Sequence, residues 1–151
     1  MLDIKDFSIF ENQSGFKKAL LTTSCTDALE MCALLIDCAP EDEIIVPSYT
    51  FVSTALAFVR QGAKIIFADS EVHNPNLDVS KLESLITPKT KGICLVHMCG
   101  GNANMDEIMA VVKEYNLILV EDAGQALGAF YKGKSVGLFG AAGAFSFDFF
   151  K

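Results

Sequence analysis

The chain has 151 residues, 51% of them hydrophobic, and a formal net charge of −7. The length suffices for one domain with a packed core, and the negative charge argues against a nucleic-acid partner, because binding a phosphate backbone requires clustered Lys and Arg. The apolar residues come in short runs, far from the roughly 18 uninterrupted residues of a membrane span, so no membrane partner is expected.

Short apolar runs alternate with helical patterns along nearly the whole chain. In chain order, the pattern predicts strands at residues 19–23, 44–46, 64–67, 93–96 and 117–120, and helices at 26–37, 51–60, 79–86 and 105–115. Asp78 should cap the third of these helices. The first helix should bury one apolar face, formed by Ala28, Leu29, Cys32, Leu35 and Ile36.

Such alternation implies an α/β fold, in which helices cover both faces of a parallel sheet. Ligands bind in these folds beyond the carboxyl ends of the strands. The candidates for a site are therefore the polar and aromatic residues that end or follow a predicted strand: Ser24, Tyr49, Phe51, His97, Asp122 and Ser146.

Asp122 comes shortly after the apolar residues 117–120. By itself, a carboxylate at this place could be a helix cap or a surface charge. In a functional interpretation it would pair with a protonated pyridine nitrogen, which keeps the ring an electron sink. Glu121 alternates to the other side of the strand and is the weaker candidate for this role. Gln125 could contact a ring hydroxyl.

The segment Ser24-Cys25-Thr26 lies between a predicted strand and a predicted helix. It could be no more than a helix N-cap. Alternatively, its N–H groups and hydroxyls could bind a phosphate, which the helix dipole would stabilise. Ser146 could add a further hydroxyl to that phosphate site, or could be an ordinary polar residue of a strand.

An aromatic ring and a lysine complete the set of candidates. Phe51 could belong to the core, or could stack on a flat cofactor ring at the carboxyl end of its strand. Lys151 ends the chain and is unremarkable alone. A lysine for a Schiff base, a carboxylate for a pyridinium nitrogen and a helix N-terminus for a phosphate are together the parts of a pyridoxal-phosphate (PLP) site.

The sequence gives no sign of a metal site. Its five cysteines include no C-x-x-C pair, and two histidines are too few for a histidine-based site. An odd number of cysteines is more typical of reduced thiols in a reducing cytosol than of disulfides. The N-terminus lacks a basic region followed by an apolar stretch, so we expect no signal peptide and a cytoplasmic location.

Three segments resemble the DegT/DnrJ/EryC1/StrS family of nucleotide-sugar aminotransferases. They are LLTTSCTDALEMCALLIDCAPEDEIIVPSYTFVSTALAFVRQGAKIIFAD, LVEDAGQALGAFYKG and GAFSFDFFK, and the resemblance covers about residues 16–151. Within the family, the SCT-ALEM and PSYTFVSTA segments are most similar to the enzymes that make dTDP-4-amino-4,6-dideoxygalactose from the 4-keto sugar.

This resemblance implies the PLP fold type I, with a three-layer αβα large domain, a mostly parallel sheet, and a homodimer whose active sites lie at the subunit interface. Through the SCT segment it places Cys25 and Thr26, next to Ser24, at the cofactor phosphate, with Ser146 as a further ligand. The remaining positions are ring stacking for Phe51, the pyridine nitrogen for Asp122, the ring hydroxyl for Gln125 and the Schiff base for Lys151.

The implied reaction moves an amino group from an amino acid, glutamate, to a dTDP-linked 4-keto-6-deoxyhexose for polysaccharide synthesis. A PLP-dependent sugar dehydratase is an alternative, although dehydrating members carry His where this chain has Lys151. A Rossmann-like binding domain is disfavoured, because no G-x-G-x-x-G follows the first strand, and a non-catalytic remnant stays open. Because family chains continue past this lysine, we expect residues 1–151 to be the N-terminal part of the large domain, incomplete and inactive alone, without the C-terminal small domain.

Overall fold

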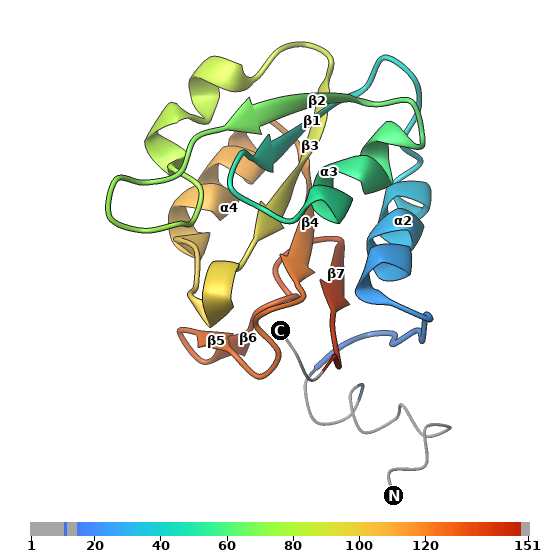
Figure 1. Cartoon of the computed structure of the whole chain (residues 1–151). Helices are drawn as coiled ribbons and strands as arrows, with labels where there is room; N and C mark the ends of the chain where they lie inside the picture. Colours follow the sequence, from blue (N-terminus) through green and yellow to red (C-terminus); the bar gives the residue numbers. More distant parts are fainter. Residues whose placement is uncertain (1–10, 12–14, 149–151) are drawn as a thin grey trace, which may run out of the picture.

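The computed structural model describes residue 11 and residues 15–148, and it contains a five-stranded parallel sheet in the order β2-β1-β3-β4-β7 (Figure 1). The strands of this sheet are β1 (Glu43–Pro47), β2 (Lys64–Ala68), β3 (Thr90–Val96), β4 (Ile118–Ala123) and β7 (Ala142–Phe145). The other elements are the helices α2 (Cys25–Leu35), α3 (Val52–Val59) and α4 (Met105–Glu114), the 3-10 turns η1 (Val79–Lys81), η2 (Glu83–Leu85) and η3 (Met98–Gly100), and a hairpin of β5 (Phe130–Tyr131) and β6 (Lys134–Ser135).

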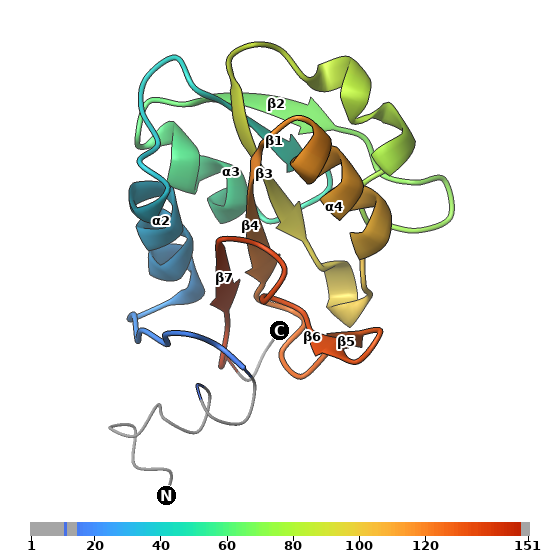
Figure 2. The same ribbon diagram turned by 180° about the vertical axis from the view of Figure 1, so that it is seen from behind.

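Helices cover both faces of the sheet, with α2 and α3 on one side and α4 on the other (Figures 1 and 2). Side chains alternate between the two faces along each strand. In β1, Ile44 and Val46 belong to the core under α2 and α3, whereas Ile45 belongs to the core under α4. The predicted α/β fold with a parallel sheet is therefore confirmed, and the predicted strands from residue 44 onward are present with ends shifted by a few residues.

The predicted strand at 19–23 is wrong, because this segment pairs with no strand in the described part of the chain. A strand requires a hydrogen-bonded neighbour for its backbone groups. Here the Ala19 N–H donates instead to the Glu11 carboxylate, and the side chains of Leu20 and Leu21 are more than half exposed. The segment is apolar in sequence, but its side chains are not buried against the sheet.

The predicted helix at 79–86 is also wrong, since the structure forms only the two short turns η1 and η2 there. Asp78 does cap the segment as predicted, and its Oδ1 accepts from the Ser80 N–H at 3.1 Å. Pro88 disfavours helical backbone at Thr87, and so few residues cannot sustain an α-helix without extensive packing. The turns instead insert the buried Leu82 into the core under α4.

The helix predicted at 26–37 is present as α2, but Leu35 does not lie on its buried face. The residues that face the sheet are spaced by three or four positions, as an amphipathic helix requires. Leu35 falls outside that stripe and is 64% exposed, and the stripe consists of Leu29, Cys32, Ala33 and Ile36.

Candidate active site

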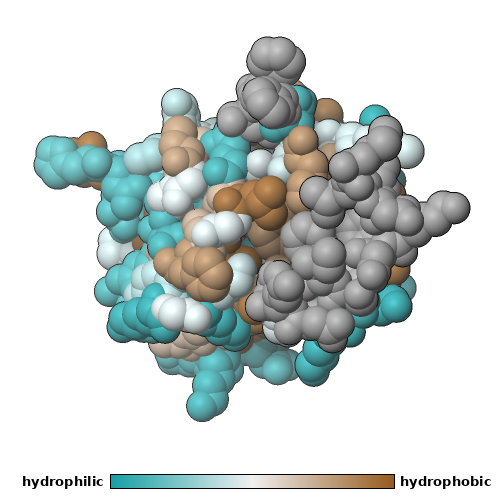
Figure 3. Space-filling view, turned by 90° about the horizontal axis from the view of Figure 1, so that it is seen from below, coloured by the Kyte–Doolittle hydropathy of each residue, from teal (hydrophilic) through white to brown (hydrophobic). Residues whose placement is uncertain are grey.

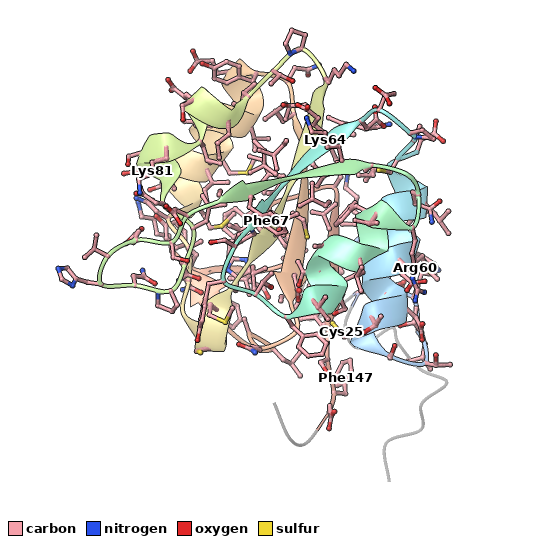
Figure 4. The ribbon with its side chains drawn as sticks, turned by 45° about the horizontal axis from the view of Figure 1, so that its top comes forward. Cys25, Arg60, Lys64, Phe67, Lys81 and Phe147 are labelled. Atoms are coloured by element: carbon pink, nitrogen blue, oxygen red, sulfur yellow. The ribbon has the colours of Figure 1, made fainter. Side chains whose placement is uncertain are left out.

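The carboxyl ends of β4 and β7 and the amino end of α2 face the same side of the molecule, at the bottom of Figure 1. In the sheet, Asp122 of β4 lies between Val96 of β3 and Ala144 of β7. Cys25 at the start of α2 and Phe147 after β7 lie at this end as well (Figure 4). The fold thus gathers candidate residues from distant segments at the strand ends, where α/β proteins bind ligands.

Asp122 is a buried carboxylate at the centre of this end, with 9% of its surface exposed. Its Oδ2 accepts a hydrogen bond from Thr54 Oγ1 at 2.8 Å, and its Oδ1 accepts one from the Gly124 N–H at 3.1 Å. Each oxygen can accept a second bond. Among the residues that the structure describes, no basic side chain forms an ion pair with Asp122. A buried charge is costly without a counter-charge, so this carboxylate suits a cationic N–H donor from a ligand.

The neighbouring carboxylate, Glu121, points to the opposite face of the sheet, as the alternation of the strand predicts, and is fully buried. Its two oxygens accept from the backbone N–H groups of Gly137, Phe139 and Gly140 at 2.6–2.7 Å, and its Oε2 lies 3.1 Å from His97 Nε2. Glu121 therefore anchors the loop that leads into β7. The sequence left open whether His97 is structural or lies near a ligand, and in the structure it is fully buried in this pair with Glu121.

The amino end of α2 carries the predicted phosphate segment. Ser24 is the N-cap, and its Oγ accepts from the Asp27 N–H at 3.1 Å. The same hydroxyl donates to the Asp27 carboxylate at 2.8 Å, and Thr23 donates to it as well. These bonds, led by that of Thr23, lower the pKa of Asp27. The cap is therefore present as predicted, but an anion bound here would share the first turn with a carboxylate.

The other candidates surround the same strand ends. Phe51 is the N-cap residue of α3 and its ring is 69% exposed, so it is available for stacking and is not a core residue. Gln125 is exposed and its Oε1 accepts from the Cys99 N–H at 2.8 Å, which leaves its amide nitrogen as a possible donor to a ligand. Ser146 follows β7, and its Oγ accepts from the Asp148 N–H at 3.3 Å. Lys151 lies outside the described residues.

Viewed from this end, hydrophobic residues gather near the centre of the face, and hydrophilic residues lie to the left of them and below them (Figure 3). The exposed large apolar residues that follow the strand ends include Phe51, Leu127 and Phe147. An exposed apolar patch of this kind commonly marks a surface that contacts a ligand or another part of a protein.

Two threonines next to Asp122 are not among the candidates that the sequence predicts. Thr54 is fully buried in α3 and donates to Asp122, and Thr50 lies 2.8 Å from Thr54 Oγ1. A signal was available, because Thr54 stands among the mostly apolar residues of α3. The sequence did not say which polar group would satisfy its hydroxyl, since Asp122 is 68 positions away.

Three thiols are buried on the α2–α3 side of the sheet, and no disulfide links the five cysteines. Burial raises the pKa of Cys32 to about 12, with smaller contributions from Cys25 and Asp122. Burial also raises the pKa of Cys94 well above the usual value, and the nearby Asp122 adds to this effect. Cys99, in contrast, is exposed.

We predict that Cys99 reacts with a thiol reagent at pH 8 much faster than Cys32 or Cys94 in the folded protein. The reactive species is the thiolate, and a raised pKa means that the thiolate of the two buried cysteines becomes populated only at far higher pH. Mass spectrometry after timed labelling would give the rates, and unfolding in urea should abolish the difference. Equal labelling of Cys32 and Cys99 before unfolding would contradict the described burial.

Two hollows lie away from Asp122. One, of about 510 Å³, follows the carboxyl ends of β1 and β2 and includes Tyr49, whereas the other, of about 390 Å³, includes Thr90 and Leu117 at the opposite end of the sheet. Within the described ranges, no cluster of three or more His, Cys, Asp or Glu side chains is suited to a metal ion. No helix in that part of the chain is both long and apolar enough to cross a membrane.

Comparison with known proteins gives consistent matches. The profile of the DegT/DnrJ/EryC1/StrS aminotransferase family matches residues 7–151. The chain is 40% identical to GDP-perosamine synthase of Caulobacter vibrioides over 138 residues, which cover 91% of this chain and 37% of that enzyme. It is 37% identical to dTDP-3-amino-3,6-dideoxy-alpha-D-galactopyranose transaminase of Aneurinibacillus thermoaerophilus, over 96% of this chain and 40% of that enzyme.

The solved structure of Spr1654 from Streptococcus pneumoniae, in its PLP form, superposes with a TM-score of 0.89 at 27% identity, covering 93% of this chain and 40% of that one. The fold is thus that of PLP-dependent aminotransferases of fold type I. The chain spans less than half the length of each of these relatives.

The described residues fit pyridoxal phosphate. Asp122 is a buried carboxylate that lacks a cationic partner among them, and a pyridinium N–H would supply one. The 11-residue helix α2 directs its amino end, with the hydroxyls of Ser24 and Thr26, to the side of the sheet where Asp122 lies. The exposed ring of Phe51 and the amide of Gln125 suit the face and the hydroxyl of the cofactor ring.

Proposed function

This chain belongs to the DegT/DnrJ/EryC1/StrS aminotransferase family, and from that premise we propose that it forms part of an enzyme that transfers an amino group from glutamate to a nucleotide-linked keto sugar. We propose a dTDP-linked 4-keto-6-deoxyhexose as the sugar and polysaccharide synthesis as the pathway class. The observation that carries the proposal is Asp122, a buried carboxylate at the carboxyl end of the sheet whose hydrogen-bond donors are Thr54 and Gly124.

The proposed site residues act on different parts of the cofactor. When bound, PLP supplies the electron sink that stabilises negative charge at the substrate carbon. Asp122 holds the proton on the ring nitrogen, and Gln125 donates to the ring hydroxyl. Phe51 covers one face of the ring and excludes water from it.

The phosphate is proposed to bind at the amino end of α2, through Ser24, Cys25 and Thr26, with Ser146 as a further ligand. Backbone N–H groups and the helix dipole favour an anion at this end. Lys151 is proposed to hold the cofactor through its Nζ, which would take the place of the aldehyde oxygen as water leaves. Displaced by the amino donor, the same amine would carry a proton to or from the substrate carbon.

The chain is proposed to be the N-terminal part of the PLP-binding large domain, acting as a homodimer in the cytoplasm. Because its relatives are more than twice as long, we propose that residues 1–151 lack turnover by themselves.

The proposal is tested with the complete protein and added PLP. Treatment with borohydride should leave the cofactor covalently attached at Lys151, which peptide mass spectrometry would locate. In a separate sample that has not been reduced, glutamate and a dTDP-linked 4-keto-6-deoxyhexose should yield an amino sugar and 2-oxoglutarate. Attachment at another lysine would remove Lys151 from the site, and a deoxygenated sugar product without amino transfer would favour the dehydratase.

A further inference from the structure

A pair of threonine hydroxyls lies behind Asp122, on the side of α3. Thr54, in the first turn of α3, is fully buried, and its Oγ1 donates to Asp122 Oδ2 at 2.8 Å. The same oxygen lies 2.8 Å from Thr50 Oγ1, in the turn before the helix. The carboxylate of β4 is thus linked through Thr54 to a second hydroxyl in the segment that follows β1.

The direction of these hydrogen bonds follows from proton count. An ionised carboxylate can only accept, and a threonine hydroxyl has a single proton to donate. When Thr54 gives that proton to Asp122, its oxygen can only accept from Thr50. The bonds therefore run from Thr50 to Thr54 to Asp122, and each strengthens the next because donation polarises the hydroxyl that accepts it.

Thr54 also connects Asp122 to the aromatic residue of the site. Its backbone N–H donates to the carbonyl oxygen of Phe51 at 3.1 Å. One residue therefore holds, through its side chain, the carboxylate proposed for the ring nitrogen, and, through its backbone, the residue proposed for ring stacking. Movement of Thr54 would disturb two contacts to the same ring.

A buried hydroxyl at this position is not needed to fill the core. The remaining residues of α3 are mostly apolar, and valine would occupy almost the same volume as threonine. A buried hydroxyl costs free energy unless it forms a hydrogen bond, and here that bond goes to Asp122. The hydroxyl therefore contributes orientation of the carboxylate, which a valine could not supply.

We propose that Thr54, supported by Thr50, is a positioning residue that fixes the plane of the Asp122 carboxylate for the cofactor ring nitrogen. Gly124 alone donates to one oxygen and leaves rotation about the Cβ–Cγ bond open. Thr54 donates to the other oxygen from a different element, so the two bonds together fix the plane. This inference rests on the proposed function, because the orientation matters only if Asp122 contacts a ligand.

The test compares Thr54→Val with Thr54→Ser in the complete protein loaded with PLP. In Thr54→Val the ring nitrogen should lose its proton about one pH unit lower, as followed by NMR of 15N-labelled cofactor, since a misplaced carboxylate holds the pyridinium less well. Turnover should fall about tenfold to a hundredfold, the range expected for one lost hydrogen bond to a charged group, with little change in the KM of the sugar. Thr54→Ser should restore both values to within about threefold, because it keeps the donor.

Thr87→Val is the matched control. Thr87 Oγ1 likewise donates to a carboxylate, that of Glu43 at 2.5 Å, but at the amino end of the sheet. This variant should leave the nitrogen titration and turnover unchanged. Thermal melts of all the variants would show whether a loss of folding explains any change.

The outcomes separate this inference from the function on which it rests. If the unaltered protein does not bind PLP, the proposed function fails. If it binds PLP and Thr54→Val titrates and turns over like the unaltered protein, the positioning role is wrong. If Thr54→Ser, which keeps the hydroxyl, is as impaired as Thr54→Val, the donor alone does not account for the effect, and the inference is equally overturned.

Discussion

Replacement of Asp122 with Asn should reduce amino transfer about a hundredfold to a thousandfold, the loss seen when one preorganised electrostatic group is removed from an active site. Asn keeps the shape of the side chain, and its amide oxygen can still accept from Thr54. It lacks the negative charge that would hold the proton on the pyridine nitrogen. A ring without that proton is a poorer electron sink, so the chemical step should slow.

The expected loss lies in kcat, with the KM of the sugar almost unchanged, because the proposed contact of Asp122 is to the cofactor. Single-turnover measurements with glutamate would isolate the half-reaction. Asp42→Asn is a suitable control, since Asp42 is a partly buried carboxylate that pairs with Lys91 next to the amino end of β1. A variant Asp122→Asn with normal turnover and only weaker sugar binding would move this residue away from the cofactor.

The sequence was most informative where a short, continuous apolar run forms a strand of the sheet. The strands at 44–46, 64–67, 93–96 and 117–120 are apolar runs between turn residues, and each lies in the sheet where it was predicted, apart from small shifts of its ends. Alternation along β4 also separated the two acidic residues correctly, since Glu121 and Asp122 bond to opposite sides of the sheet.

The failures have a common physical cause, which is that a local pattern does not specify its partners. Residues 19–23 have the composition of a strand but pair with no neighbouring strand in the described chain. Residues 79–86 have an apolar pattern that suits a helix, but two short turns are enough to bury Leu82 in the core. The same limit applies to the site. The sequence singled out Asp122 as a candidate, but not the hydroxyl of Thr54 that donates to it, because that contact joins residues far apart in the chain.

Truncation of Glu121 should strongly destabilise the fold. Its carboxylate accepts from three backbone N–H groups of the loop before β7 and lies within hydrogen-bond distance of His97. The side chains of Glu121 and His97 are both fully buried. Backbone groups that lose their acceptor inside a protein keep the full cost of desolvation. We therefore expect Glu121→Ala to lower the free energy of unfolding by about 3–5 kcal/mol, the range for breaking a buried charged network.

Glu121→Gln should lower the free energy of unfolding less than Glu121→Ala, because some of the hydrogen bonds of the carboxylate can still form. Phe139 and Gly140 both donate to Oε1, so an amide oxygen at that position keeps these two bonds. The amide nitrogen would then replace Oε2, where it meets the N–H of Gly137 donor to donor. His97 could adapt, because a change of tautomer lets its Nε2 accept from the new amide.

Urea unfolding followed by circular dichroism would measure these differences, with Glu43→Ala as the matched control. Glu43 is also an acidic residue buried in a strand, but its partners are the exposed side chains of Lys64 and Thr87. Removing it leaves donors that water can reach, so its loss should lower the free energy of unfolding far less than the loss of Glu121. Equal destabilisation by Glu43→Ala and Glu121→Ala would mean that the loop before β7 does not depend on the Glu121 carboxylate. A large difference would instead tie the position of β7, and of Ser146 directly after it, to an acidic residue on the face of the sheet opposite Asp122.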